Sequence, residues 1–234
     1  MIDSAALRAR LTDVRERIAR AASRAGRDPA AIRLVAVSKT FSSAHVRLAA
    51  QAGQIDFGEN TVQEGLRKIA ETSDLALRWH LIGHLQSNKA RKAAAFDAVH
   101  AVDGPDLLRK IDDGAVAGGR TLEVMIQVDL AGEPTKHGAP EEELAPIFEA
   151  AAQCRAARLS GLMLLPPAVA TAEDARPYFT RLRALQGRRA TGGVDSAMLA
   201  QLSMGMSHDF EVAVEEGATL VRVGSAIFGD RHYS

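Results

Sequence analysis

A lysine at the end of a short apolar segment is the first residue of this sequence that could do covalent chemistry. Lys39 closes the run Ile32-Arg-Leu-Val-Ala-Val-Ser-Lys39, which is typical of a strand buried in a parallel sheet. Apolar surroundings at such a strand end disfavour the ammonium form and lower the pKa of the amine. A neutral amine is the form that condenses with an aldehyde to an imine. Lys39 is therefore a candidate for covalent attachment of an aldehyde; the alternative is a surface lysine whose stem extends along the strand end.

An arginine near the end of the chain is the second candidate. In Thr219-Leu-Val-Arg-Val-Gly224, the two-residue period of a strand places Leu220, Arg222 and Gly224 on one face and the two valines on the other. If the valines face surrounding helices, Arg222 points into the sheet interior, where a guanidinium needs an acceptor. Either an acidic side chain inside the protein or a ring nitrogen or phosphate of a ligand could serve.

Two segments near the C-terminus have the composition of a phosphate site. Gly224-Ser225 lies at a predicted strand-to-helix junction, where glycine permits close approach and the helix offers free N–H groups to an anion. Ser203-Met-Gly-Met-Ser207 adds two hydroxyls and a glycine. Ser207 could alternatively be the N-cap of a helix over 208–216.

Other candidate signals are weaker. His80 and His84 have a spacing that would bind metal on a helix, but the segment 79–83 reads as a strand, where they would lie about 13 Å apart. No metal site is therefore predicted. The loop 129–140 could act as a lid that carries Lys136 and His137 towards a ligand, although a solvated loop is the simpler interpretation.

Alternating strand and helix patterns predict the scaffold that positions these residues. Helical spacing of Leu7, Leu11, Val14 and Ile18 predicts an N-terminal helix that ends near Gly26. Eight strand-like segments follow, at 32–38, 55–58, 79–83, 98–102, 123–129, 159–165, 201–204 and 219–223. Helical patterns lie between them, and Thr61 and Glu64 have capping-box spacing at the start of one helix. Strict alternation predicts a parallel sheet with right-handed crossovers, and eight repeats in this length favour a closed (β/α)8 TIM-type barrel.

Composition limits the classes of protein that the chain could be. Its 234 residues carry 29 basic and 29 acidic side chains, so no electrostatic footprint for nucleic acid or an anionic membrane is present. The single cysteine, Cys154, is expected to be a small buried side chain in a helix. No apolar run approaches the roughly 18 residues that a membrane span needs. We expect one α/β domain over residues 1–234, acting in the cytoplasm.

Several long motifs resemble those of one known family. They are Val35-Ala-Val-Ser-Lys39, Phe57-Gly-Glu-Asn60, Trp79-His-Leu-Ile-Gly-His-Leu-Gln-Ser-Asn-Lys89, Leu202-Ser-Met-Gly-Met-Ser207 and Val221-Arg-Val-Gly-Ser-Ala-Ile-Phe-Gly229. The sequence is similar to the pyridoxal phosphate homeostasis proteins (the YggS/PROSC group), which are related to the N-terminal barrel of alanine racemase. The resemblance spans residues 32–231. It implies an alanine racemase-like barrel of the third fold type among pyridoxal phosphate proteins, with an extra N-terminal helix.

The resemblance also implies roles for particular residues. Lys39 matches the Schiff-base lysine for pyridoxal 5′-phosphate (PLP, the active form of vitamin B6), and Arg222 matches the arginine that faces the pyridine nitrogen. The implied phosphate binders are Ser203, Gly224 and Ser225, with the backbone of Met204 and Gly205 nearby. Asn60 and His80 would line the ring pocket.

The expected function is non-catalytic: storage or delivery of PLP, held on Lys39, in intracellular PLP homeostasis, with PLP-dependent apoenzymes as partners and a monomeric state. Racemisation by the related enzyme needs a tyrosine from a second domain across a dimer interface. This chain has two tyrosines, Tyr178 on a predicted outer helix and Tyr233 at the terminus. A weak PLP-dependent amino-acid racemase is the first alternative. A Schiff-base aldolase, in which Lys39 attacks a carbonyl substrate directly, is the second.

Overall fold

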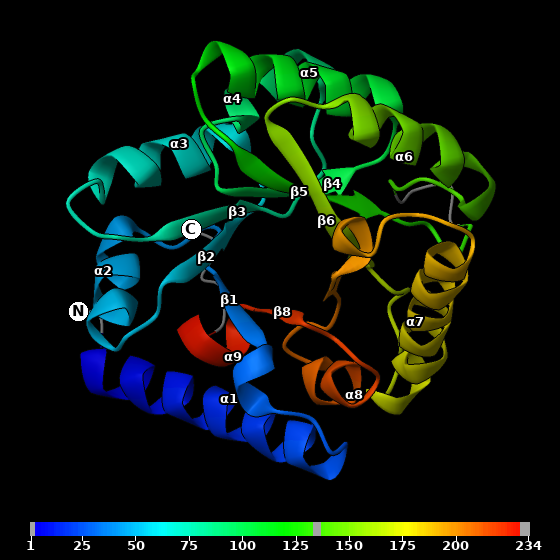
Figure 1. The fold of residues 1–234 in the computed structure, drawn as a ribbon. Coiled ribbons are helices and arrows are strands. Elements are labelled where there is room, and N and C mark those ends of the chain that lie inside the picture. Colours follow the sequence, from blue (N-terminus) through cyan, green and yellow to red (C-terminus); the bar gives the residue numbers. More distant parts are fainter. Residues whose placement is uncertain (1–2, 133–136, 230–234) are drawn as a thin grey trace.

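A closed barrel of parallel strands forms the centre of the computed structural model (Figure 1), which describes residues 3–132 and 137–229. Within these ranges eight strands pair in chain order, and the last returns to pair with the first. They are β1 (Arg33–Val37), β2 (Asp56–Glu59), β3 (Arg78–Leu81), β4 (Ala98–Val102), β5 (Leu122–Gln127), β6 (Ala157–Met163), β7 (Gln201–Ser203) and β8 (Leu220–Val223). Each boundary lies within two residues of its predicted position. The predicted (β/α)8 barrel is confirmed.

Alternation along the strands separates two apolar clusters. A small cluster inside the barrel consists of Val35, Met125, Met163 and Leu220. The larger cluster lies between the strands and the helices, and it contains Val221 and Val223. Neighbouring residues of β8 therefore face opposite sides, as the two-residue period predicts. Since Arg222 shares the face of Leu220, its side chain points into the barrel.

The helices surround the barrel (Figure 1). In the described ranges they are α1 (Ser4–Arg24), α2 (Ser43–Gln51), α3 (Val62–Glu71), α4 (Ala90–Ala93), α5 (Pro105–Ala117), α6 (Leu144–Gln153), α7 (Arg176–Thr191), α8 (Phe210–Glu215) and α9 (Ser225–Phe228). The predicted extra N-terminal helix is α1, which contacts α2, α8 and α9. It buries the residues of the predicted apolar stripe, namely Leu7, Leu11, Val14 and Ile18. None of the helices in the described ranges has the length and apolar character needed to cross a membrane.

Two local predictions differ from the structure. The helix predicted over 208–216 begins only at Phe210, and its N-cap residue is Asp209. Asp209 accepts a hydrogen bond from the Met206 amide at 2.6 Å, so the carboxylate closes the turn ahead of the helix. Cys154 lies just past the end of α6 and is half-buried. Burial raises the pKa of its thiol to about 11, which leaves it as an unreactive thiol.

Candidate functional site

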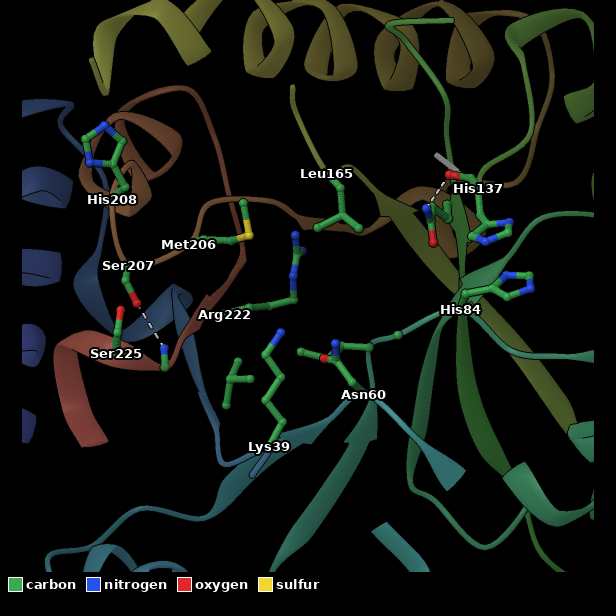
Figure 2. A pocket seen from close by; sticks show the side chains of 15 residues that line it. Lys39, Asn60, His84, His137, Leu165, Met206, Ser207, His208, Arg222 and Ser225 are labelled. Atoms are coloured by element: carbon green, nitrogen blue, oxygen red, sulfur yellow. Dashed lines mark hydrogen bonds between the residues drawn. The ribbon is translucent and has the colours of Figure 1, made fainter. Parts of the chain in front are cut away.

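A cavity of about 490 Å³ opens at the carboxyl ends of the barrel strands. This is the face where (β/α)8 barrels build their functional sites, because the loops that follow the strands meet there. Figure 2 shows side chains from several of these loops around the cavity. Five residues predicted from the sequence line it: Lys39, Asn60, Arg222, Gly224 and Ser225.

Lys39 and Asn60 reach the cavity from the first two strands. Lys39 follows β1, and in Figure 2 its side chain extends into the cavity with Asn60 beside it. Gly83, which follows β3, packs closely against Asn60: a Cβ atom at this glycine would lie 2.3 Å from the Asn60 carbonyl oxygen. A side chain at position 83 would therefore displace Asn60 from the wall of the cavity.

Arg222 is held rigidly at the floor of the cavity. It is only 2% exposed, and its guanidinium donates to Ser203 Oγ at 2.6 Å and to the Leu164 carbonyl oxygen at 2.8 Å. Burial lowers its pKa to about 10, an effect that Asp209 partly opposes. Arg222 therefore remains a cation at neutral pH. Its two hydrogen bonds go to a hydroxyl and a carbonyl, in place of the acidic partner that the sequence left open.

A chain of hydrogen bonds runs from Arg222 through the barrel interior. Ser203 Oγ lies 2.9 Å from His100 Nδ1, His100 Nε2 lies 3.0 Å from His80 Nδ1, and His80 Nε2 lies 2.9 Å from Asp56 Oδ1. Since a carboxylate only accepts, a neutral His80 carries its proton on Nε2 and accepts at Nδ1 from His100. His100 Nδ1 then accepts from Ser203, whose oxygen accepts from Arg222. Every donor in the chain points from the cavity towards Asp56.

Three of the predicted site residues are engaged elsewhere in the structure. His80 is fully buried below the cavity, because the inward face of β3 carries its ring into the barrel. Ser203 is also fully buried, and Arg222 and His100 already use its hydroxyl. The Met204 amide donates to the Leu220 carbonyl oxygen at 3.1 Å as part of the sheet. None of the three is among the residues that line the cavity. The predicted ring contact of His80 and phosphate contacts of Ser203 and Met204 do not match this arrangement.

The corner of the cavity where β8 meets α9 carries the hydroxyl groups of Ser207 and Ser225. Ser207 Oγ accepts from the amides of Gly224 at 3.1 Å and Ala226 at 3.5 Å, so Ser207 covers the start of α9 and does not cap α8. Ser225 lines the same corner. Gly205 adopts a φ of +92°, and a Cβ atom there would lie 2.5 Å from Ala213 Cβ. A glycine is therefore required for the β7 loop to turn across α8 and present Ser207.

The rim of the cavity carries two histidines, one of which belongs to the 129–140 loop that could act as a lid. His84 and His137 line the cavity, and their rings stack with centroids 3.4 Å apart and planes 10° apart. Burial and the neighbouring His137 lower the pKa of His84, while Asp103 opposes this shift. Lys136 of this loop lies outside the described residues, and His137 shows that the second half of the loop reaches the cavity. Gln127 holds it by donating to the His137 carbonyl oxygen.

One group of potential metal ligands exists in the described part of the chain. It consists of His84, Asp103 and His137, whose ligand atoms lie within 4.8 Å of one another. Because the two rings are nearly parallel, their in-plane lone pairs lie in separate planes and do not converge on one ion in this arrangement. The sequence analysis considered a different pair, His80 and His84. Only the tertiary structure shows that His137, 53 positions after His84, lies against it.

Further residues of the cavity wall carry little signal in the sequence. They are Val37, Ile82, Gly83, Gln127, Leu165, Met206 and His208. The available clue was position, because each of them ends or follows a predicted strand. Position alone does not distinguish a wall residue from any other loop residue.

Comparison with known proteins gives a consistent set of relatives. The sequence matches the family model described as alanine racemase, N-terminal domain, over residues 2–232. It is 46% identical over 224 residues to a pyridoxal phosphate homeostasis protein of Pseudomonas aeruginosa, covering 95% of each chain. A protein of the same name from Aquifex aeolicus is 41% identical over 225 residues, covering 96% of this chain and 98% of the relative.

Solved structures show the same relationship. PipY of Synechococcus elongatus PCC7942, solved with PLP bound, has a TM-score of 0.83 and 37% identity, covering 95% of this chain and all of the other. Alanine racemase of Streptomyces coelicolor A3(2) has a TM-score of 0.72 and 21% identity, covering 98% of this chain and 59% of the racemase. The likeness to the racemase is one of fold.

Proposed function

Because the chain belongs to the pyridoxal phosphate homeostasis protein family, on the fold of the alanine racemase N-terminal domain, we propose that it binds PLP in the cavity around Lys39 and Arg222. Its function is homeostasis of this cofactor, which it stores and delivers. The relative PipY, solved with PLP bound, supports this assignment.

The donor groups of the cavity fit PLP. The cofactor has an aldehyde, a pyridine nitrogen that accepts a hydrogen bond, and a phosphate. Lys39 supplies an amine, Arg222 supplies guanidinium donors, and Ser207 and Ser225 supply hydroxyl groups at one corner, beside Gly224. The volume of about 490 Å³ lies within the usual range for a small-molecule site. The single observation that carries the proposal is that these three kinds of group line one cavity.

The roles of the residues follow from their chemistry. When bound, PLP supplies an aldehyde that condenses with an amine, with loss of one water. Lys39 Nζ would form that bond, and Arg222 would donate to the pyridine nitrogen. Since Arg222 keeps its proton at neutral pH, it holds the pyridine nitrogen in the unprotonated state. An unprotonated ring is a weaker electron sink than a pyridinium, which suits storage of the cofactor or, at most, racemase-like proton transfer.

A weak amino-acid racemase is the second candidate. Racemisation needs a second acid or base besides Lys39, and His84 and His137 line the same cavity. Tyr178 lies on α7 and is not among the residues that line the cavity, and Tyr233 lies outside the described residues. We favour the carrier function because Tyr178, the one tyrosine in the described ranges, is not at the cavity to act as a second acid or base beside Lys39. We further propose that the protein acts as a monomer in the cytoplasm and transfers PLP to apoenzymes.

The first test is attachment of PLP to Lys39. Purified wild type, Lys39→Ala and the surface control Lys110→Ala are incubated with PLP, reduced with borohydride and mapped by peptide mass spectrometry. We expect a new visible absorption band and a labelled Lys39 peptide in the wild type and the control, and neither in Lys39→Ala. A label on another lysine, or an unchanged band in Lys39→Ala, would overturn the assignment. Borohydride trapping of a carbonyl substrate without PLP would instead support an aldolase.

The second test separates carrier from racemase. The PLP-loaded wild type is incubated with single-enantiomer amino acids, followed by chiral chromatography, and in parallel with a PLP-dependent apoenzyme whose activity reports transfer. The carrier function predicts reactivation of the apoenzyme and no turnover to the opposite enantiomer. Multiple turnovers that disappear in a His84→Ala, His137→Ala double variant would establish the racemase.

A further inference from the structure

The backbone that presents Lys39 adopts a tight turn with an unusual conformation. The Phe41 amide donates to the Ser38 carbonyl oxygen at 3.0 Å, so Lys39 and Thr40 are the two central residues of a four-residue turn. Thr40 has a φ of +70° and is the only residue other than glycine with positive φ in the described ranges. Type II turns require positive φ at this position and usually place glycine there. A β-branched residue is disfavoured in this region.

Two side chains of α3 hold this turn from both sides of Lys39. Glu64 Oε1 accepts from the Thr40 amide at 2.7 Å. Lys68 Nζ donates to the Ser38 carbonyl oxygen, also at 2.7 Å. The residues immediately before and after Lys39 are therefore each bonded to the same helix. We call Glu64 and Lys68, together with Glu59, the clamp.

Lys68 is buried in a way that ordinary packing does not require. Its side chain is fully buried, and its three ammonium donors go to the Ser38 carbonyl oxygen, to Glu59 Oε1 at 2.7 Å and to Glu64 Oε1 at 2.9 Å. Ser38 Oγ also donates to Glu59 Oε1, at 2.6 Å. Burial raises the pKa of Glu59, and Lys68 opposes that shift. A buried ion pair is often no more stabilising than apolar residues of the same volume, so the clamp calls for a reason other than stability.

We propose that Lys68 is a positioning residue for Lys39: with Glu59 and Glu64 it holds the 38–41 turn in its left-handed conformation, so that the Lys39 amine is presented to the cavity. The proposal rests on the proposed function of Lys39. The clamp residues are not among those that line the cavity. The clamp acts on the backbone on both sides of Lys39.

Thr40→Gly distinguishes positioning from a general structural role. Glycine adopts positive φ without steric cost, so it should keep the turn in place when the clamp is removed. If Lys68 only secures α3 to the barrel, the same glycine would restore neither the conformation of the turn nor the presentation of Lys39. We therefore compare wild type, Lys68→Met, Lys68→Met combined with Thr40→Gly, and the exposed-lysine control Lys110→Met.

The first measurement needs no cofactor. Amide hydrogen exchange of the 38–41 peptide, corrected for intrinsic rates, should be at least tenfold faster in Lys68→Met and close to wild type in the double variant. The α5 peptide 105–117 serves as the internal reference, and Lys110→Met should resemble the wild type throughout. Unchanged exchange of the 38–41 peptide in a folded Lys68→Met protein would overturn the clamp.

The second measurement follows attachment of PLP to Lys39 by absorption in a stopped-flow instrument. We expect at least a tenfold slower rate in Lys68→Met and recovery of at least threefold on adding Thr40→Gly. Faster exchange with an unchanged attachment rate, or slow attachment that the glycine does not restore, would overturn positioning. If the wild type fails to attach PLP at Lys39, the proposed function fails, while the exchange data still test the clamp.

Another pair of variants covers the case in which Lys68→Met does not fold. Glu64→Gln keeps an oxygen that can accept from the Thr40 amide, whereas Glu64→Ala removes it. The proposal predicts fast exchange and slow attachment for Glu64→Ala only. Identical behaviour of the two variants would contradict it.

Discussion

Replacing His100 by glutamine should change how the stability of the cofactor-free protein depends on pH. The pKa of His100 lies well below its ordinary value of 6.5. Burial is the largest cause, and the charges of His80, Arg222 and Arg33 follow in that order. The folded protein therefore keeps this ring neutral under mildly acidic conditions. A neutral ring also fits the hydrogen-bond chain, because it can accept from Ser203 at one nitrogen and donate to His80 at the other. In the unfolded chain the same ring takes up a proton near pH 6.5.

The sign of the effect follows from proton binding. Below pH 6.5 the unfolded state binds a proton that the folded state does not, so the free energy of unfolding falls as the pH falls. The slope approaches about 1.4 kcal/mol per pH unit. Between pH 7.5 and pH 5.0 this single group removes about 2 kcal/mol from the wild type. The contribution of His100 to the free energy of unfolding is fully present above its unfolded pKa. It decreases as the pH falls, until the pH reaches the folded pKa.

Glutamine preserves the hydrogen bonds without the titration. Its carbonyl oxygen can accept from Ser203 and its amide can donate to His80. Urea unfolding of wild type and His100→Gln at several pH values gives the difference in free energy of unfolding, in which titrating groups that do not interact with His100 cancel. We expect this difference to shift by about 2 kcal/mol in favour of the variant between pH 7.5 and 5.0. The half-buried His45 offers a control, since His45→Gln should give a smaller shift. Parallel stability curves for wild type and His100→Gln would refute the assignment of a neutral His100.

Two further predictions concern other hydrogen bonds. Ser207→Ala removes the hydroxyl that accepts from the Gly224 and Ala226 amides and that would donate to the phosphate of PLP. Loss of about 1 kcal/mol should weaken PLP binding roughly fivefold. Binding of pyridoxal, which lacks the phosphate, should not change, and an equal loss for both ligands would contradict a phosphate site. Asp112→Ala leaves three backbone amides, of Arg155, Ala156 and Ala157, without their carboxylate acceptor. The expected loss is about 3 kcal/mol in urea unfolding, and a loss below about 1 kcal/mol would show that water replaces the acceptor.

Much of the fold could be predicted because the strands carry a strong periodic signal. Alternation in β8 separated Arg222 from its neighbouring valines, and the observed clusters agree with it. The helical stripe of α1 was equally clear. Ends of elements were less certain, since capping depends on a few local hydrogen bonds. Asp209, and not Ser207, precedes α8 because its carboxylate reaches the Met206 amide.

The sequence by itself determined the barrel, the site at the strand ends and the presence of Lys39, Arg222 and Ser225 there. These depend on short-range periodicity and on the rule that loops after parallel strands converge. The place of Asn60 was implied only by the resemblance to a known family. Nothing comparable signals a contact between residues far apart in the chain.

Only the tertiary structure decided which polar residues meet each other. Ser203 and His100 are 103 positions apart, and their contact depends on the register of strands around the closed barrel. Lys68 looks like an ordinary helix lysine in the sequence, yet α3 places it beneath the Lys39 turn, fully buried. The physical reason is that a hydrogen bond requires its atoms to lie within about 3 Å. Local patterns give the direction of a side chain, whereas packing of the whole barrel sets that distance.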